Sequence, residues 1–219
     1  MDFHKKVAAI IAKKFGIGIV SFRSFLDKAI IEGIGWVRKR VKFLMNDVEA
    51  VQLVNCLVST LCLDGSVAEV GCFEGGSAAL MAMFDQVRPI HAFDSFKGLP
   101  ATGKDDSFFE KGNFTGSYQK AFDLVSNFRN VTLTRGTFPE SAGMIQDKNF
   151  AFVHLDVDLF EGTLSCLNFF YPKMVRSGII LVHDYPSSEG VNAAINTFFE
   201  GKPEIVVKLS GNQAMIVKT

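Results

Sequence analysis

The sequence predicts a single α/β domain with a mostly parallel sheet, helices on both faces and an antiparallel end. Short apolar runs alternate with segments of helical periodicity, which is the order expected of βαβ units. Two of these runs, Ala151–Asp158 and Gly178–Val182, are unbroken, as in strands buried on both faces. The last two runs flank Gly211 and Asn212 and indicate a hairpin, which supplies the antiparallel end. With 219 residues and 48% hydrophobic content, the chain has enough apolar surface for one core.

A basic arm comes first. Residues 1–44 contain ten Lys or Arg against three Asp or Glu, which leaves thirteen against twenty for the remainder. Apolar positions recur at helical spacing and are interrupted by glycines at 16–18 and 33–35, so we expect two or three short amphipathic helices in a segment 1–45. Such an arm lies on an anionic membrane, carries a contact between protomers of a homo-oligomer, or docks on its own domain. Nucleic-acid binding is disfavoured, because the basic residues form no recognised motif and the body is acidic.

The domain proper, residues 46–219, begins with a helix to Leu61 that has an N-cap candidate at Asn46 or Asp47. A buried strand at Val67–Gly71, a glycine-rich turn and a helix at 78–84 follow. Glycine lets the backbone approach a ligand, and the amides at the helix start attract polar or anionic groups. The dinucleotide fingerprint G-x-G-x-x-G is absent, because it requires glycine where Phe73 stands.

The second strand, Pro89–Phe93, ends in Asp94, about twenty residues downstream, where an acid commonly accepts the ribose hydroxyls of an adenosine ligand. The segment Ser95–Gly116 is rich in glycine and aromatic residues and longer than most connections, so we expect a lid or a mobile surface. A helix near Tyr118–Phe128 and a strand at Val131–Thr134 complete this half of the domain.

Two neighbouring strands end in charged side chains. The run Ala151–Asp158 ends in Asp156 and Asp158, which share one face, roughly 6–7 Å apart at Cα, if the strand continues through them. The next run ends in His183 and Asp184. Because ligands collect beyond the carboxyl ends of parallel strands, we expect three carboxylates and an imidazole in one small region, able to hold a cation. Alternatively, these acids only cap the helices that follow.

The remaining elements are a helix at Glu161–Tyr171 between the two acid-tipped strands, a helix at Val191–Phe199, and strands at Ile205–Lys208 and Gln213–Val217. Seven strands are therefore expected in all. The four cysteines form no C-x-x-C pair, and the sequence has no signal-peptide pattern and no run of about 20 apolar residues. These observations favour a cytoplasmic protein.

Four segments carry a family resemblance: E-V-G-C-F-E-G-G-S (69–77), H-A-F-D-S-F-K-G-L-P (91–100), V-H-L-D-V-D-L-F-E-G-T (153–163) and G-I-I-L-V-H-D-Y (178–185). In this order they resemble the macrocin O-methyltransferase (TylF-type) family of class I S-adenosylmethionine-dependent enzymes. The likeness covers about residues 47–217 and implies a Rossmann-like class I methyltransferase fold. The first 45 residues lie outside it.

The resemblance implies donor-binding residues in three groups. The first strand and its turn take the methionine end, the acid of the second strand takes the ribose, and the turn after the third strand lies near the adenine. In this sequence the corresponding residues are Glu69, Gly71, Phe73, Ser77, Asp94, Ser95, Gly136, Thr137 and Phe138, with Asp156 also at the donor.

The resemblance also implies a divalent cation, usually Mg²⁺, held by an acid that matches Asp156 and by an acid pair after the next strand. Here that pair is His183 and Asp184. Replacing one carboxylate by an imidazole removes a negative charge and a hard oxygen, so Mn²⁺ and Fe²⁺ become alternatives. The acid matching Asp158 is the family's proposed general base.

The function expected is cation-assisted O-methylation of a hydroxyl on a sugar or natural product. Two other classes stay open. One is a non-catalytic relative with this fold, docked to a membrane or partner by its arm. The other is a metal-dependent hydrolase that uses Asp156, Asp158 and Asp184 and has no need of Asp94 or the glycine turn.

Overall fold

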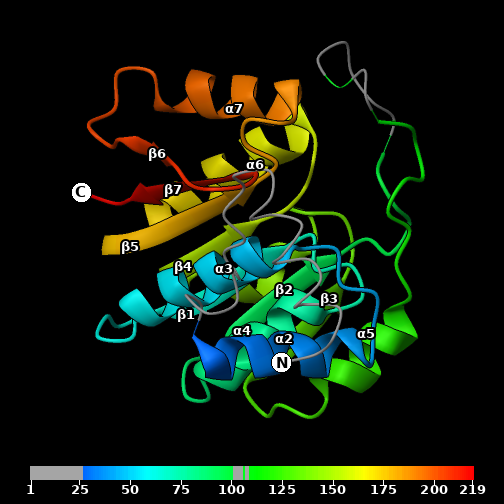
Figure 1. Cartoon of the computed structure of the whole chain (residues 1–219). Helices are drawn as coiled ribbons and strands as arrows, with labels where there is room; N and C mark the ends of the chain where they lie inside the picture. The colour runs from blue at the N-terminus through cyan, green and yellow to red at the C-terminus, as the bar shows by residue number, and fades with distance from the viewer. Residues whose placement is uncertain (1–26, 101–105, 107–108) are drawn as a thin grey trace, which may run out of the picture.

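The computed structural model describes residues 27–100, 106 and 109–219. Seven strands form one sheet in the order β3-β2-β1-β4-β5-β7-β6 (Figure 1). Strands β1 to β5 are parallel, β7 is antiparallel to β5, and β6 is antiparallel to β7. The predicted parallel sheet with an antiparallel end is therefore confirmed. The strands are β1 (Ser66–Val70), β2 (Ile90–Asp94), β3 (Val131–Arg135), β4 (Phe150–Leu155), β5 (Met174–His183), β6 (Val206–Lys208) and β7 (Gln213–Val217).

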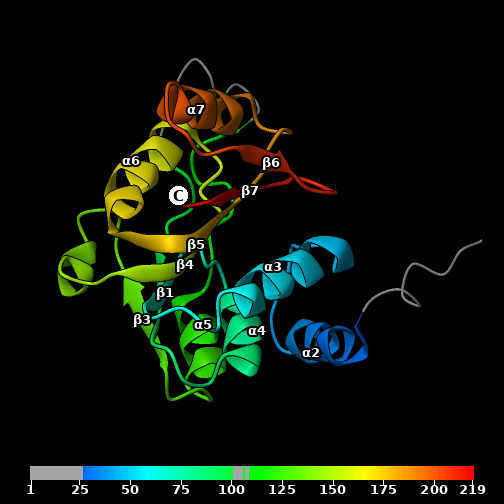
Figure 2. The same ribbon diagram turned by 90° about the vertical axis from the view of Figure 1, so that its left-hand side faces the viewer.

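Helices cover both faces of the sheet (Figure 2). One face carries α2, α3 and α4, with α5 beside α4, and the other carries α6 and α7. Short 3-10 turns η2 (Ala142–Ile145) and η3 (Tyr171–Lys173) precede β4 and β5. The helices are α2 (Lys28–Arg38), α3 (Asp47–Ser59), α4 (Gly76–Phe84), α5 (Tyr118–Val125), α6 (Phe160–Phe170) and α7 (Glu189–Phe199). Among the residues described, no helix combines the length and apolarity needed to cross a bilayer.

Side chains of the central strands contribute to two separate apolar layers, one on each face of the sheet. Val67 and Phe152 point to the layer under α2, α3 and α4, whereas Val70 and Leu155 point to the layer under α6 and α7. This division follows from the alternation of side chains along a strand. Because both faces are covered, β1 and β4 are buried along their whole lengths. Their carboxyl ends are thus held rigidly at one edge of the sheet.

Helix α3 begins with a capping box. The side chain of Asn46 accepts hydrogen bonds from the amides of Val48 and Glu49, and the Glu49 carboxylate accepts one from the Asn46 amide. Three amides at the helix start that have no partner within the helix are satisfied in this way. The expected helix, its N-cap and its packing against the sheet are confirmed.

Helix α2 corrects the predicted organisation of the arm. We expected a break at residues 33–35, but the helix runs through Gly33 and Gly35 without interruption. A Cβ at Gly33 would lie 3.1 Å from Cδ1 of Leu80, so glycine lets α2 approach α4 closely. Ile34 and Val37 are buried in the layer beneath. Residues 1–26 lie outside the described part of the chain, so the membrane and protomer contacts stay predictions.

Strand β4 is shorter than expected. We predicted that it continues through Asp156 and Asp158, but it ends at Leu155. The amide of Asp156 still donates to the carbonyl of Val70, at 2.9 Å, and Asp158 then adopts a left-handed conformation with φ of 62°. That conformation turns the chain toward α6, so the two acids do not share a strand face.

The long connection Ser95–Gly116 has no helix or strand among its described residues. One of them, Asp106, is buried, and its carboxylate accepts a hydrogen bond from the amide of Phe160, the first residue of α6. The connection is thereby tied across the edge of the sheet where β4 ends. Whether it acts as a lid stays a prediction, because residues 101–105 and 107–108 lie outside the described ranges.

Candidate active site

A cavity of about 380 Å³ lies at the carboxyl ends of the parallel strands. Strands β1, β2 and β5 and the turns after β3 and β4 all contribute residues to it, as expected for a doubly wound sheet. The structure brings most of the predicted site residues to this one cavity. They are Gly71, Phe73, Asp94, Ser95, Gly136, Thr137, Phe138, Asp156, Asp158, His183 and Asp184.

The turn after β1 packs directly on the turn after β4. Gly71 has a φ of 90°, and a Cβ there would lie 1.8 Å from the carbonyl oxygen of Asp156. Only glycine fits both the conformation and the space. Phe73 follows with a φ of 49°, and Gly75, with a φ of 78°, precedes α4. The two turns form one continuous wall.

Asp94 holds the glycine turn in place. One of its carboxylate oxygens accepts from the amide of Phe73 at 2.8 Å and the other from the amide of Phe96 at 2.7 Å. Burial raises the pKa of this carboxyl, although the two amides oppose the rise. Asp94 therefore anchors two loops and also borders the cavity, where its remaining lone pairs are available to a ligand.

Glu69 and Ser77 do not border the cavity. Glu69 precedes Val70 by one residue and so points to the opposite face of β1, where its carboxylate lies 2.9 Å from Nδ1 of His154. The two residues are register partners on β1 and β4, and both side chains are fully buried. Ser77 is buried in the first turn of α4. Neither side chain borders the cavity, so their part in binding the methyl donor stays a prediction.

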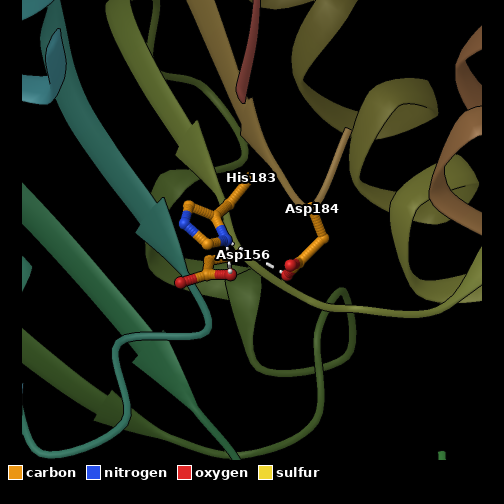
Figure 3. Close-up of side chains that lie close together, drawn as sticks. All are labelled: Asp156, His183 and Asp184. Carbon is orange, nitrogen blue, oxygen red and sulfur yellow. Dashed lines mark hydrogen bonds and ion pairs between the residues drawn. The ribbon is translucent and has the colours of Figure 1, made fainter. Parts of the chain in front are cut away.

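Three predicted cation ligands converge at the edge of the cavity (Figure 3). Nδ1 of His183 lies 3.3 Å from Oδ1 of Asp156 and 3.1 Å from Oδ2 of Asp184. Each residue offers one ligand atom, and these atoms lie within 4.8 Å of one another. Asp184, like Asp158, has a left-handed backbone, with a φ of 60°. The last residue of β5 and the turns after β4 and β5 thus form one cluster.

The charges of this cluster are strongly coupled. Burial alone would lower the pKa of His183, but Asp156, followed by Asp184 and Glu49, raises it well above its usual range. The pKa of Asp156 is lowered, because His183 outweighs the effect of burial. The pKa of Asp158 is raised to about 9 by burial and by the carboxylates of Asp156 and Asp184. Asp158 is therefore the acid of this group that holds a proton most tightly.

The donor set fits a divalent cation. Two donors in adjacent positions on an octahedral ion lie about 3 Å apart when the bonds are about 2.1 Å long, close to the separations from His183 to Asp156 and Asp184. Two carboxylates and one imidazole form a mixed oxygen and nitrogen set. Mn²⁺ and Fe²⁺ accept imidazole more readily than Mg²⁺ does, so the set favours a transition metal.

Several residues of the site were not anticipated from the sequence. Leu44 and Met45, which precede α3, border the cavity, as do Asp106 and Phe109 from the long connection. Glu49 approaches His183 from α3, with 3.4 Å between Oε2 and Nε2. The capping-box spacing from Asn46 to Glu49 is visible in the sequence, but it indicates a helix start and gives no sign of a contact with β5.

A sequence model of the family described as macrocin-O-methyltransferase (TylF) matches residues 38–208. The chain belongs to this family. Residues 38–45, which we had assigned to the arm, fall within the match. The fold is accordingly the Rossmann-like fold of class I methyltransferases, as the resemblance implied.

Two relatives of known activity align with part of the chain. The 8-demethyl-8-(2,3-dimethoxy-alpha-L-rhamnosyl)-tetracenomycin-C 4'-O-methyltransferase of Streptomyces olivaceus is 27% identical over 138 residues, which is 55% of this chain and 53% of that protein. Demethyldecarbamoylnovobiocin O-methyltransferase of Streptomyces niveus is 27% identical over 145 residues, with the same coverage. The chain thus spans about half the length of each.

Solved structures with the same fold align with a larger share of the chain than these two relatives do. The O-methyltransferase NovP superposes with a TM-score of 0.68 at 20% identity, covering 77% of this chain and 78% of NovP. The Podospora anserina methyltransferase PaMTH1, solved with SAH bound, has a TM-score of 0.59 at 14% identity, with 100% of this chain and 98% of that one covered. At these identities the likeness establishes the fold.

Proposed function

We propose that this protein is an S-adenosylmethionine-dependent O-methyltransferase, assisted by a divalent cation, that acts on a hydroxyl of a sugar or natural product. One observation carries the proposal. The glycine turn and Asp94 border the same cavity as Asp156, Asp158 and the His183–Asp184 pair. A donor-binding wall and a group of acids thus face the same space.

The donor half of the cavity supplies positioning. S-adenosylmethionine, when bound, provides a methyl group on a positively charged sulfur. The glycine turn at Gly71 allows close backbone approach, and the Asp94 carboxylate, fixed by two backbone amides, is suited to accept the ribose hydroxyls. Phe138 borders the cavity, and its ring stacks on that of Phe170, with 5.1 Å between the ring centroids. Packed in this way, the ring of Phe138 offers a rigid apolar surface to a planar base.

The acid half supplies a proton acceptor. In this proposal Asp158 takes the proton of the acceptor hydroxyl as the oxygen forms its bond to the methyl carbon and the bond from that carbon to sulfur breaks. The raised pKa of Asp158 reflects its burial and, after that, the negative charges of Asp156 and Asp184 beside it. The backbone carbonyl of Asp158 accepts from the hydroxyl of Ser188, at 3.0 Å, which anchors this residue to the start of α7. The backbone of the proposed base is therefore tied to the start of α7.

Asp156, His183 and Asp184 would hold the cation. A bound divalent ion supplies positive charge next to the acceptor hydroxyl, lowers the pKa of that hydroxyl and offsets the negative charge around Asp158. An ion with open positions favours acceptors with two adjacent oxygens, such as a sugar diol or a catechol. The two relatives are named for methylation of a rhamnosyl-tetracenomycin and of demethyldecarbamoylnovobiocin, which supports a hydroxyl of a natural product as the acceptor.

Apolar residues form the rest of the wall. Leu44, Phe109 and Phe114 border the cavity, and Leu44 and Phe114 are also partly exposed at its rim. An acceptor that combines a polar diol with an apolar ring system would match this combination of acids and aromatic side chains. The proposed acceptor is therefore a hydroxylated natural product with an apolar portion.

Calorimetry and a transfer assay test the proposal. S-adenosylmethionine should bind the purified chain, and transfer of a labelled methyl group to catechol or to an alkyl rhamnoside should require Mn²⁺ or Mg²⁺ and stop on addition of EDTA. Donor binding without transfer to any diol would favour the non-catalytic alternative. Absence of donor binding together with cation-dependent hydrolysis would favour the hydrolase. Either result would overturn the proposal.

A further inference from the structure

His183 has a carboxylate partner at each ring nitrogen. Nδ1 faces Asp156 and Asp184 on the cavity side, whereas Nε2 lies 3.4 Å from Oε2 of Glu49. Glu49 does not border the cavity and is only 4% exposed. The imidazole is thus placed between the proposed cation site and a carboxylate buried behind it.

The Glu49 carboxylate is itself held in a fixed position. Oε2 accepts from the amide of Asn46 at 3.0 Å, and Oε1 accepts from the amide of Asn212 at 3.3 Å. A Cβ at Gly211 would lie 2.9 Å from Oε1, so glycine in the turn between β6 and β7 leaves room for this side chain. Two backbone segments far apart in sequence therefore orient one carboxylate toward His183.

This arrangement determines which nitrogen of His183 is available to a cation. A ring that ligates a metal through Nδ1 carries its proton on Nε2, and Nε2 is the nitrogen that Glu49 faces. Metal-bound histidines commonly donate their other ring N–H to a carboxylate, which fixes the ring and strengthens the ligand nitrogen. If the cation ligands were all carboxylates, a carboxylate in the position of Glu49 would repel them and would have no imidazole ring to orient.

We propose that Glu49 is a positioning residue that presents Nδ1 of His183 to the cation and so shifts the site from Mg²⁺ toward Mn²⁺ or another ion that accepts imidazole. The inference rests on the cation-assisted function proposed above. It adds a residue outside the cavity and a preference among cations. A role limited to capping α3 makes the opposite prediction, since a cap affects stability and leaves cation affinity unchanged.

Binding of Mn²⁺ and Mg²⁺ to the full chain, without donor or acceptor, tests the inference by calorimetry and by the electron paramagnetic resonance signal of free Mn²⁺. Glu49→Ala should weaken Mn²⁺ binding by about 10 to 100-fold. Glu49→Gln, which keeps an oxygen able to accept from Nε2, should have a smaller effect and serves if the alanine variant does not fold. Asn46→Ala is the matched control, because it removes the side-chain cap of α3 and leaves Glu49 facing His183.

A double-mutant cycle separates orientation from simple charge. His183→Asp should tighten Mg²⁺ relative to Mn²⁺, and in that background Glu49→Ala should no longer weaken cation binding, because no ring remains to orient. If Glu49→Ala weakens binding equally in both backgrounds, or leaves the Mn²⁺ to Mg²⁺ ratio of the wild type unchanged, the inference is overturned. If the wild type binds neither ion, the cation part of the proposed function fails as well, whereas donor binding is measured independently.

Discussion

Two clusters of charged side chains in this protein differ in how their charges are balanced. Near the C-terminus, Glu204 accepts from Lys218 Nζ at 2.8 Å, from the hydroxyl of Tyr171 at 2.8 Å and from Thr219. One carboxylate there meets one ammonium group and neutral donors. At the edge of the sheet, the carboxylates of Asp156, Asp158 and Asp184 share one imidazole, that of His183.

The two clusters also differ in the backbone strain of the residues around them. Six non-glycine residues in the described part of the chain have positive φ, and four of them border the cavity: Phe73, Phe114, Asp158 and Asp184. None belongs to the cluster of Glu204. Strained residues and excess negative charge both raise the free energy of the folded state unless something compensates, and a bound ligand is a common compensation. The comparison marks the cluster of Glu204 as structural and supports the proposal that the second cluster holds a cation and substrate.

The largest effect that follows from this comparison is on turnover. Asp158→Asn should lower kcat by about 10² to 10⁴-fold, because it removes the proton acceptor. Added Mn²⁺ or Mg²⁺ should not restore the rate. The melting temperature near neutral pH should stay close to that of the wild type, because the raised pKa of Asp158 leaves this side chain protonated there and asparagine replaces a neutral acid. Glu204→Gln is the matched carboxylate control and should leave kcat unchanged. Equal losses in both variants would remove the distinction between the clusters.

Asp156→Asn should fail differently, because it weakens the cation site and leaves the proton acceptor in place. At low Mn²⁺ we expect turnover to fall by about 10 to 100-fold. Raising the cation concentration should restore part of the rate, which a titration of initial rate against Mn²⁺ measures. A loss that no cation concentration reduces would show that Asp156 has no part in holding an ion.

The donor half of the cavity should respond separately from the acids. Asp94→Ala should weaken S-adenosylmethionine binding by about 10-fold or more, because hydrogen bonds to a charged group contribute about 1.5–3 kcal/mol. The loop at Phe73 also loses an anchor, so a modest fall in melting temperature is expected. Mn²⁺ affinity measured by calorimetry should stay at the wild-type value. Unchanged donor affinity would contradict the assignment of Asp94.

The smallest effect concerns stability at acid pH. Burial alone would raise the pKa of Glu204, but its hydrogen bonds from Lys218 and Tyr171 lower it from 4.5 to about 2. A carboxyl with a lowered folded-state pKa stabilises fully above pH 4.5, and this contribution is lost as pH falls toward 2. Glu204→Gln should lower the melting temperature by a few degrees at pH 7, with the difference from wild type shrinking at pH 3. If the difference in melting temperature between wild type and Glu204→Gln were the same at pH 7 and pH 3, the charge of Glu204 would not contribute to stability.

The sequence by itself determined the elements and their order. Short apolar runs between helical segments identified all seven strands. The signal is strongest for the central strands, because a strand buried on both faces is apolar at most positions. The N-cap candidates Asn46 and Asp47 identified the start of α3, since a helix cap is a local interaction within a few residues. Two strands ending in acids indicated where the site lies, because parallel strands have their carboxyl ends at one edge.

Only the tertiary structure decided the directions of individual side chains. In the structure β4 ends at Leu155, and Glu69 is buried against His154. Glu49 contacts His183 and the amide of Asn212. The tertiary structure also placed α2 in the core, through a glycine that had indicated a break in the helix. Each of these contacts joins residues far apart in sequence or depends on the packing of a neighbouring element. Local periodicity carries no information about such partners, so the fold was predictable where the detailed contacts of the site were not.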